Sequence, residues 1–106
     1  MSADAMPRRA MVHFALDHPT AAGHFPGYPI IPGAALLEEI VSAIAASGTV
    51  AGICEVRAAK FLRPVRPGDS IDVKWTAPMG RDVRFEAFAA GNELAVTGAL
   101  VVNGGP

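Results

Sequence analysis

The sequence predicts an α+β domain in which an antiparallel sheet wraps one face of a single helix. The length of 106 residues suits one small domain, so we expect one domain over residues 1–106 and no two-domain enzyme. Helical spacing of apolar residues occurs in one segment, residues 34–47. From Gly52 onward, short β-type runs alternate with turn residues, which completes the pattern of this fold class.

The chain before the helix is expected to form one strand and then an irregular segment. Residues 8–16 contain β-branched and aromatic side chains, which predict a first strand. From Asp17 to Gly33 the chain holds four prolines and three glycines, a density that neither a helix nor a central strand tolerates. We therefore expect a long, stiff connection between the strand and the helix.

The predicted helix over residues 34–47 follows a Pro-Gly pair and stops at Gly48. Its only charges are Glu38 and Glu39, near the start, so we expect the helix to be mostly buried. The helical wheel places Glu38 beside an apolar stripe and Glu39 further towards solvent. That stripe is formed by Leu37, Val41 and Ala45. Stabilisation of the positive helix end would explain either glutamate without a catalytic role.

Four β-type runs follow the helix, and three or four of them are expected to form an antiparallel meander. In the second run, apolar Ile71, Val73 and Trp75 alternate with polar residues, as in a half-buried strand. The dipeptide Gly91-Asn92 suits a two-residue hairpin loop between the last two runs. The predicted strands are residues 53–63, 70–77, 82–90 and 93–102.

Composition excludes several classes of function. Nine Lys and Arg against ten Asp and Glu, without a long run of either sign, leave no nucleic-acid-binding footprint. The single cysteine, Cys54, cannot form an internal disulfide, so a reducing compartment is expected by default. We expect Cys54 to be a buried strand thiol. No Cys/His spacing matches a zinc site, so we expect no metal.

The chain is expected to be soluble and cytoplasmic, and to associate with another copy. Residues 1–10 contain two arginines without a following apolar region, so no signal peptide is predicted. The most apolar stretch, residues 28–46, contains prolines and two glutamates that a membrane-spanning helix would not carry together. Because 51% of the residues are hydrophobic and 18% are charged, part of the apolar surface is expected to lie in an oligomer interface.

The segment GHFPGYPIIPG, residues 23–33, carries the main candidate for chemistry. Its prolines recur every third residue, which also suits a polyproline II ligand for a partner domain. Such ligands usually lie in disordered tails, whereas this segment leads directly into the most apolar helix. Rigid prolines and small glycines can instead hold one side chain in a fixed orientation, and His24 is that side chain. A lone loop histidine is, however, more often a surface or hydrogen-bonding residue.

These residues strongly resemble the 3-hydroxyacyl-acyl-carrier-protein dehydratases of fatty acid synthesis, which have the hotdog fold. A second match follows the helix at KFLRPVRPGD, residues 60–69, so that two matches in order cover about half of the chain. The compact form with the DHPTAAGHFPG lead-in is similar to dehydratase-like subunits of polyketide or aryl-polyene pathways. The resemblance implies dehydration of a 3-hydroxyacyl thioester to the trans-2-enoyl thioester, without a cofactor.

The resemblance also implies the site and the partners. His24 would remove the α-proton, Glu38 would protonate the departing 3-hydroxyl, and the backbone N–H of Gly33 would bind the thioester carbonyl. The substrate would arrive on the phosphopantetheine of an acyl carrier protein. A homodimer or higher oligomer with shared active sites is expected. Candidate substrate-binding residues are Phe25, Tyr28, Ile30, Ile31 and Phe61, for which core packing is an equally good explanation.

Some features leave alternatives open. Arg63 and Arg66 could dock the acidic carrier, although arginines beside a turn are more often a solvated edge. Many members of the family have a glutamine one turn after the acid, where this chain has Ser42. The alternatives are therefore a hotdog acyl thioesterase, which would not require the HFPG histidine, and a non-catalytic acyl-binding or scaffold subunit, against which the presence of both His24 and Glu38 argues.

Overall fold

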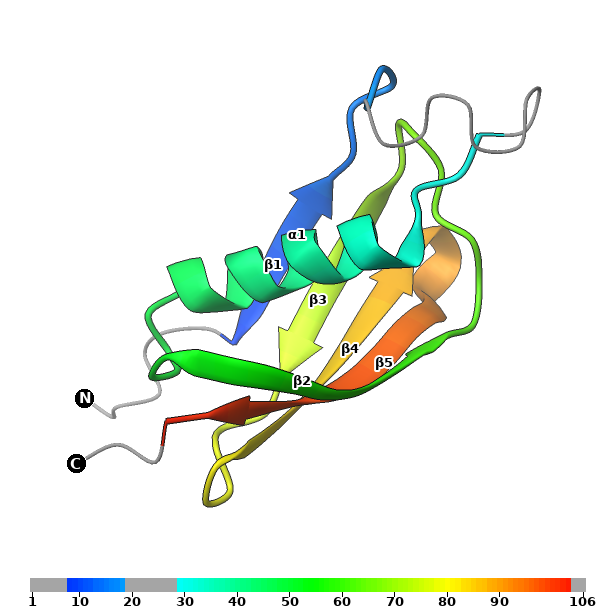
Figure 1. The fold of residues 1–106 in the computed structure, drawn as a ribbon. Coiled ribbons are helices and arrows are strands. Elements are labelled where there is room, and N and C mark those ends of the chain that lie inside the picture. Colours follow the sequence, from blue (N-terminus) through cyan, green and yellow to red (C-terminus); the bar gives the residue numbers. More distant parts are fainter. Residues whose placement is uncertain (1–7, 19–28, 104–106) are drawn as a thin grey trace.

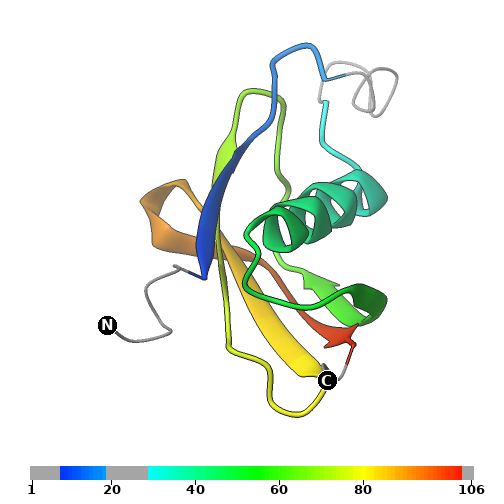
Figure 2. The same ribbon diagram turned by 90° about the vertical axis from the view of Figure 1, so that its left-hand side faces the viewer.

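The structure, a computed structural model, describes residues 8–18 and 29–103. A five-stranded antiparallel sheet curves around one helix, as Figures 1 and 2 show from two sides, and the predicted α+β class is confirmed. The elements are β1 (Arg9–His13), α1 (Gly33–Ala46), β2 (Ile53–Phe61), β3 (Ser70–Trp75), β4 (Asp82–Ala89) and β5 (Glu93–Val102), with a 3₁₀ turn at Ala90–Asn92. The bounds of β5 are those predicted, and the other elements differ by one to three residues at their ends.

The strand order in the sheet is β1-β3-β4-β5-β2. Of the expected three or four meandering strands, three form the meander, β3, β4 and β5, and β2 lies outside it. β2 pairs with β5, the last strand, instead of with β3, the next one. The reason is visible in Figure 1, where α1 crosses the sheet and delivers the chain to the far edge. β1 and β2 are consequently the two edge strands.

The core lies between α1 and the inward-facing side chains of the sheet. Leu36, Ile40 and Ile44, spaced four residues apart, are the fully buried residues of the helix. They belong to one cluster with the alternate, inward-facing residues of the central strands. Those strand residues include Ile71, Val73, Trp75, Val83, Phe85 and Leu100.

Two expectations about the helix were wrong. Its buried face is centred on Leu36, Ile40 and Ile44, because these residues meet the sheet, while Ala45 of the predicted stripe is exposed. The helix is also not mostly buried within one chain. Its outer face is exposed at Ala34, Glu38, Ser42, Ala45 and Ala46, and these residues are small except for Glu38.

The end of α1 is tied to β3 by a short chain of hydrogen bonds. The Ser47 hydroxyl donates to the Ile44 carbonyl at 2.6 Å, and the Thr49 N–H donates to the Ser47 hydroxyl at 3.1 Å. The indole N–H of Trp75 then donates to Thr49 Oγ1 at 2.8 Å. The tryptophan ring, 6% exposed, is thereby held between the helix end and the sheet.

The loop between β4 and β5 is a residue longer than predicted. Ala89 pairs with Glu93, so Ala90, Gly91 and Asn92 form the connection in place of Gly91-Asn92 alone. The two predicted turn residues do adopt positive φ angles, 77° at Gly91 and 60° at Asn92. This backbone conformation explains why glycine and asparagine stand there.

Cys54 is exposed, so the expectation of a buried strand thiol was wrong. β2 is an edge strand, and the Cys54 thiol lies 3.0 Å from Asn103 Oδ1, to which it donates. Within the described ranges, α1 and the 3₁₀ turn fall short of the length and apolarity needed to cross a bilayer.

Gly98 allows a close approach of its neighbours within the sheet. A Cβ atom at this position would lie 2.5 Å from the Ala58 carbonyl oxygen and 2.6 Å from the Phe85 ring. We expect Gly98→Ala to lower the free energy of unfolding by about 1–3 kcal/mol, because neither backbone nor a buried ring can move aside freely. Urea unfolding measures the change, with Ala99→Ser on the same strand as a control expected to stay within about 0.5 kcal/mol. Equal unfolding midpoints for Gly98→Ala and the wild type would contradict the packing.

Candidate active site

A cavity of about 280 Å³ lies where the start of α1 meets the end of β2. Ile30, Ile31, Gly33 and Phe61, four of the residues predicted for the site, line it together. The cavity is also lined by Leu36, Leu62, Arg63 and Pro64. The two sequence motifs, far apart along the chain, thus meet at one place.

Backbone hydrogen bonds and proline geometry position the helix start. The N–H of Ile31 donates to the Val65 carbonyl at 2.7 Å, which fixes the end of the proline-rich segment beside the chain that follows β2. Pro32, the residue before the helix, is extended with φ −60° and ψ 149°. The N–H of Leu36 makes the first intrahelical bond, to the Pro32 carbonyl at 3.0 Å.

Gly33 and Phe61 fit closely against each other. A Cβ atom on Gly33 would lie 3.0 to 3.3 Å from three atoms of the Phe61 ring. The absence of a side chain therefore lets the ring pack over the first turn of α1. The N–H of Gly33 precedes the first intrahelical bond and lies at the positive end of the helix, where a backbone N–H can donate to a developing oxyanion.

The cavity has an apolar rim and a closed floor. Phe61 and Leu62 at the rim are 45% and 47% exposed, which is high for large apolar side chains. Ile31 and Leu36 are 2% and 3% exposed and belong to the core cluster. This arrangement suits the entry of an apolar ligand from the surface.

The two helix glutamates lie differently from the helical-wheel expectation. Glu38 is exposed, about 160° around the helix from Leu36 and Ile40, and so faces away from the sheet. Glu39, expected to lie further towards solvent, is half-buried, with its carboxylate 4.0 Å from Nε2 of His18. His18 also packs against the Phe14 ring, at 5.8 Å between ring centroids. The expected order of exposure was wrong because it followed from the wrong helix stripe.

His24, Phe25 and Tyr28 lie outside the described residues. The relation between His24 and Glu38 therefore stays a prediction. The described part of the site is the floor, the rim and the helix start.

The two candidate docking arginines lie on the chain between β2 and β3. Arg63 lines the cavity, and its Nη2 lies 3.3 Å from Glu93 Oε2 in an ion pair whose side chains are both about half exposed. Arg66 is exposed in the following turn, where its backbone N–H donates to Asp69 Oδ2 at 2.9 Å. Arg63 is thus at the cavity, and Arg66 is not among its lining residues.

Sequence reasoning missed Leu36, Leu62 and Pro64 as lining residues. Leu62 and Pro64 flank Arg63 in the second motif, so a signal was available there. Leu36 stands one turn after the Pro-Gly pair, but the predicted stripe placed the buried face one residue further along the chain. Because the buried face of the helix was predicted wrongly, Leu36 was not recognised as a residue that lines the cavity.

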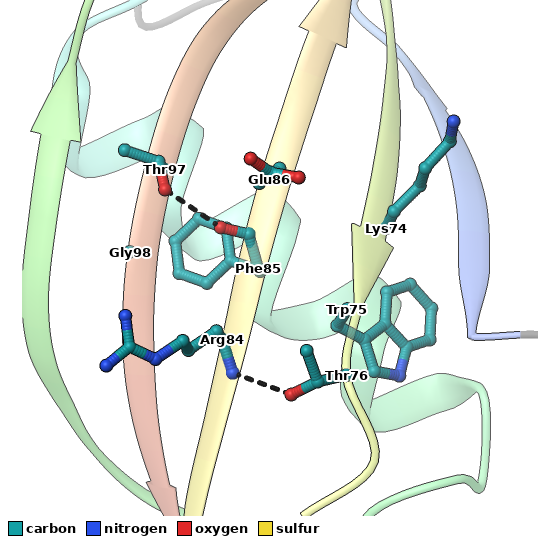
Figure 3. Close-up of a pocket in the computed structure, with 8 residues that line it drawn as sticks. All are labelled: Lys74, Trp75, Thr76, Arg84, Phe85, Glu86, Thr97 and Gly98. Atoms are coloured by element: carbon teal, nitrogen blue, oxygen red, sulfur yellow. Dashed lines mark hydrogen bonds between the residues drawn. The ribbon is translucent and has the colours of Figure 1, made fainter.

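A larger cavity, of about 370 Å³, lies on the face of the sheet away from α1. Figure 3 shows it over β3, β4 and β5, with the Arg84 side chain laid across β5 and Lys74 extending towards β1. The Thr97 hydroxyl donates to the Phe85 carbonyl at 3.2 Å beneath it. None of the predicted site residues lines this cavity, so the candidate site is the one at the helix start.

In the described part of the chain, no three or more His, Cys, Asp or Glu side chains are grouped so as to hold a metal ion.

The edge strand β2 next to the cavity is exposed along almost its whole length. Among the described residues it pairs with β5 on one side only, so its other edge presents backbone N–H and C=O groups. Val56, Phe61 and Leu62 add exposed apolar side chains on and just after this strand. The surface formed by β2 and the outer face of α1 has the character of an interface.

Comparison with protein families gives a match to the ApeI-like family, described as ApeI dehydratase, over residues 4–99. Among curated proteins, the 3-hydroxyacyl-[acyl-carrier-protein] dehydratase FabZ of Blochmanniella pennsylvanica is 34% identical over 97 residues, or 80% of this chain and 64% of that protein. FabZ of Chlamydia trachomatis serovar D is 35% identical over 107 residues, 86% of this chain and 68% of that protein. For FabZ of Thermus thermophilus the values are 32% identity over 80 residues, 67% of this chain and 56% of that protein. The chain thus spans between about half and two thirds of the length of these relatives.

Two solved structures have the same fold. The dehydratase heterocomplex ApeI:P of Xenorhabdus doucetiae superposes with a TM-score of 0.69 at 21% identity, covering 94% of this chain and 90% of that chain. The R-hydratase PhaJ1 of Pseudomonas aeruginosa gives a TM-score of 0.58 at 18% identity, with 92% and 79% covered. The expected hotdog fold is confirmed.

Proposed function

Since the chain belongs to the ApeI-like dehydratase family, we propose that it dehydrates a 3-hydroxyacyl thioester, carried by an acyl carrier protein, to the trans-2-enoyl thioester. One observation carries the proposal: the apolar cavity opens directly at the helix start, beside Gly33. A thioester carbonyl can meet the Gly33 N–H while the acyl chain enters the cavity. The family resemblance supports an acid and a base that act beside that helix start.

The proposed reaction needs one base, one acid and one oxyanion donor. His24 removes the proton from the α-carbon, and the negative charge that develops on the thioester oxygen is stabilised by the Gly33 N–H. The electron pair then forms the α–β double bond as the bond from the β-carbon to its oxygen breaks. Glu38 gives its proton to that oxygen, which leaves as water. Since no electrons are gained or lost, the proposed reaction requires no redox cofactor.

The exposed position of Glu38 favours a site that is completed by a second copy. A glutamate that acts as a general acid usually lies in an apolar, enclosed setting, whereas Glu38 is exposed to solvent within one chain. A second copy on β2 and the outer face of α1 would pair the free strand edge and cover Glu38. We therefore propose a homodimer or larger oligomer with shared sites. A related, non-identical chain is the alternative, because a similar structure is a heterocomplex.

Arg63 and Arg66 are proposed as docking residues for the acidic carrier protein. The ion pair of Arg63 with Glu93 is largely solvated and therefore weak, so a carrier carboxylate can compete for the arginine. In this setting the enzyme would work in the cytoplasm, in fatty acid synthesis or a polyketide or aryl-polyene type of pathway.

One assay separates the proposal from its alternatives. The protein is incubated with a 3-hydroxyacyl thioester of a carrier protein, and enoyl formation and free thiol are measured together. Enoyl product without thiol supports the dehydratase. Free thiol indicates the hotdog thioesterase, and neither product indicates a non-catalytic acyl-binding or scaffold subunit.

The two helix glutamates provide a matched pair of variants. We expect Glu38→Gln to lower the dehydration rate at least about tenfold, because glutamine cannot donate the proton that the leaving hydroxyl needs. Glu39→Gln, one residue away, is expected to keep the rate within a few-fold. Steady-state kinetics on both variants, with unfolding curves to compare stability, test this order. A larger loss at Glu39 would assign the acid to the glutamate that contacts His18.

A further inference from the structure

The buried residues that line the cavity, its floor, separate the candidate site from the protein core. Leu36 lines the cavity, is 3% exposed and belongs to the core cluster. Phe61 and Leu62 at the rim are nearly half exposed. The apolar path from the surface therefore meets the core at two buried side chains, Ile31 before the helix and Leu36 on it.

Beyond Leu36 the space between helix and sheet is filled. Ile40, one turn further along α1, has no exposed surface, and neither has Ile44 on the next turn. Phe85 faces this layer from β4 and is 1% exposed. Because protein interiors are close-packed, an acyl chain cannot continue past Leu36 without displacing these residues.

From this geometry we infer that Leu36 sets the length of the acyl chain that the site accepts, and that the substrates are short-chain 3-hydroxyacyl thioesters. The inference rests on the proposed function and deepens it. In one chain the cavity measures about 280 Å³, slightly less than the roughly 300–1,000 Å³ of typical ligand sites, which agrees with a short chain. Each methylene group that fits into an apolar pocket changes kcat/KM appreciably, so a change in the floor alters the preference for chain length.

The experiment compares 3-hydroxybutyryl and 3-hydroxydecanoyl thioesters of a phosphopantetheine-bearing carrier protein. The wild type is expected to have the higher kcat/KM with the butyryl substrate. Leu36→Ala is expected to raise the decanoyl-to-butyryl ratio of kcat/KM at least about tenfold, because removal of the isobutyl group deepens the floor. Leu36→Val makes a smaller change in the same direction and replaces the alanine variant if that variant does not fold.

Ile40→Ala is the matched control. Ile40 is on the same buried face, one turn away, and does not line the cavity. This variant loses core packing as Leu36→Ala does, but its chain-length ratio is expected to equal that of the wild type.

The outcomes separate the inference from the proposed function. A ratio that stays constant in the Leu36 variants overturns the role of Leu36, as does an equal rise in Ile40→Ala. A wild-type preference for the decanoyl substrate overturns the short-chain assignment. If the wild type dehydrates neither substrate, the proposed function itself fails.

Discussion

Replacement of His24 by alanine is expected to lower the rate of dehydration by about 100-fold or more, since general acid-base catalysis typically contributes this much. An imidazole with an ordinary pKa near 6.5 can take a proton at neutral pH, and alanine cannot. The loss should appear in kcat with little change in the urea midpoint. The urea midpoint should change little because a histidine in a proline-rich connection is not expected to pack in the core.

His13 is the natural control for this experiment. It lies on β1, where its Nδ1 is 2.9 Å from Ser70 Oγ, and it is exposed. His13→Ala removes the same side chain and should retain activity within a few-fold. If His24→Ala also stays within a few-fold of the wild type, the base is another residue and the family mechanism does not apply.

Mixing two inactive variants is expected to restore roughly a quarter of wild-type activity, if each site takes His24 from one copy and Glu38 from the other. Random pairing of His24→Ala with Glu38→Ala chains makes about half of the dimers mixed, and each mixed dimer has one intact site of two. Sites built within one chain would restore nothing. The gain over either variant alone is therefore large and easily measured.

The measurement requires that mixed dimers be seen directly. The two variants, one with an affinity tag, are unfolded and refolded together, and the tagged fraction is analysed for the untagged chain. The dehydration rate of the whole refolded mixture, before the tagged fraction is taken, is compared with that of each variant refolded alone. An inactive sample that contains mixed dimers would rule out shared sites of this kind.

The secondary structure was largely predictable because its signals are local. Alternating apolar residues predicted β3 over Ser70–Trp75 to within two residues at its end, and the Pro-Gly pair and Gly48 bracket α1. The bounds of β5 were correct because a turn precedes it and the run of apolar residues is long. These signals depend on neighbours in the chain and not on the tertiary fold.

Exposure and strand order were less predictable because they depend on contacts between distant segments. Cys54 lies in a β-type run, which led to the prediction of a buried thiol. Because α1 crosses the sheet, β2 is an edge strand, and Cys54 is exposed. The buried face of α1 follows from where the sheet lies, and a helix rich in apolar residues fits more than one face. The floor residue Leu36 was missed for this reason.

The candidate site was predictable where two motifs pointed to it. Ile30, Ile31 and Gly33 belong to the proline-rich motif, Phe61 belongs to the second motif, and all four line one cavity. The close fit of the Phe61 ring over Gly33 could not be read from either motif alone, since it depends on the docking of the helix start against β2.

Trp75 gives the chain a built-in optical probe. It is the single tryptophan, it is almost entirely buried, and its indole N–H bonds to Thr49 just beyond the end of α1. Separation of the helix end from the sheet would break that bond and expose the ring to water, with a shift of its fluorescence emission to longer wavelength. The emission therefore reports whether α1 is seated on the sheet, without any dye. A fast-mixing fluorimeter can follow how soon the helix docks during refolding, and therefore when the floor of the cavity forms.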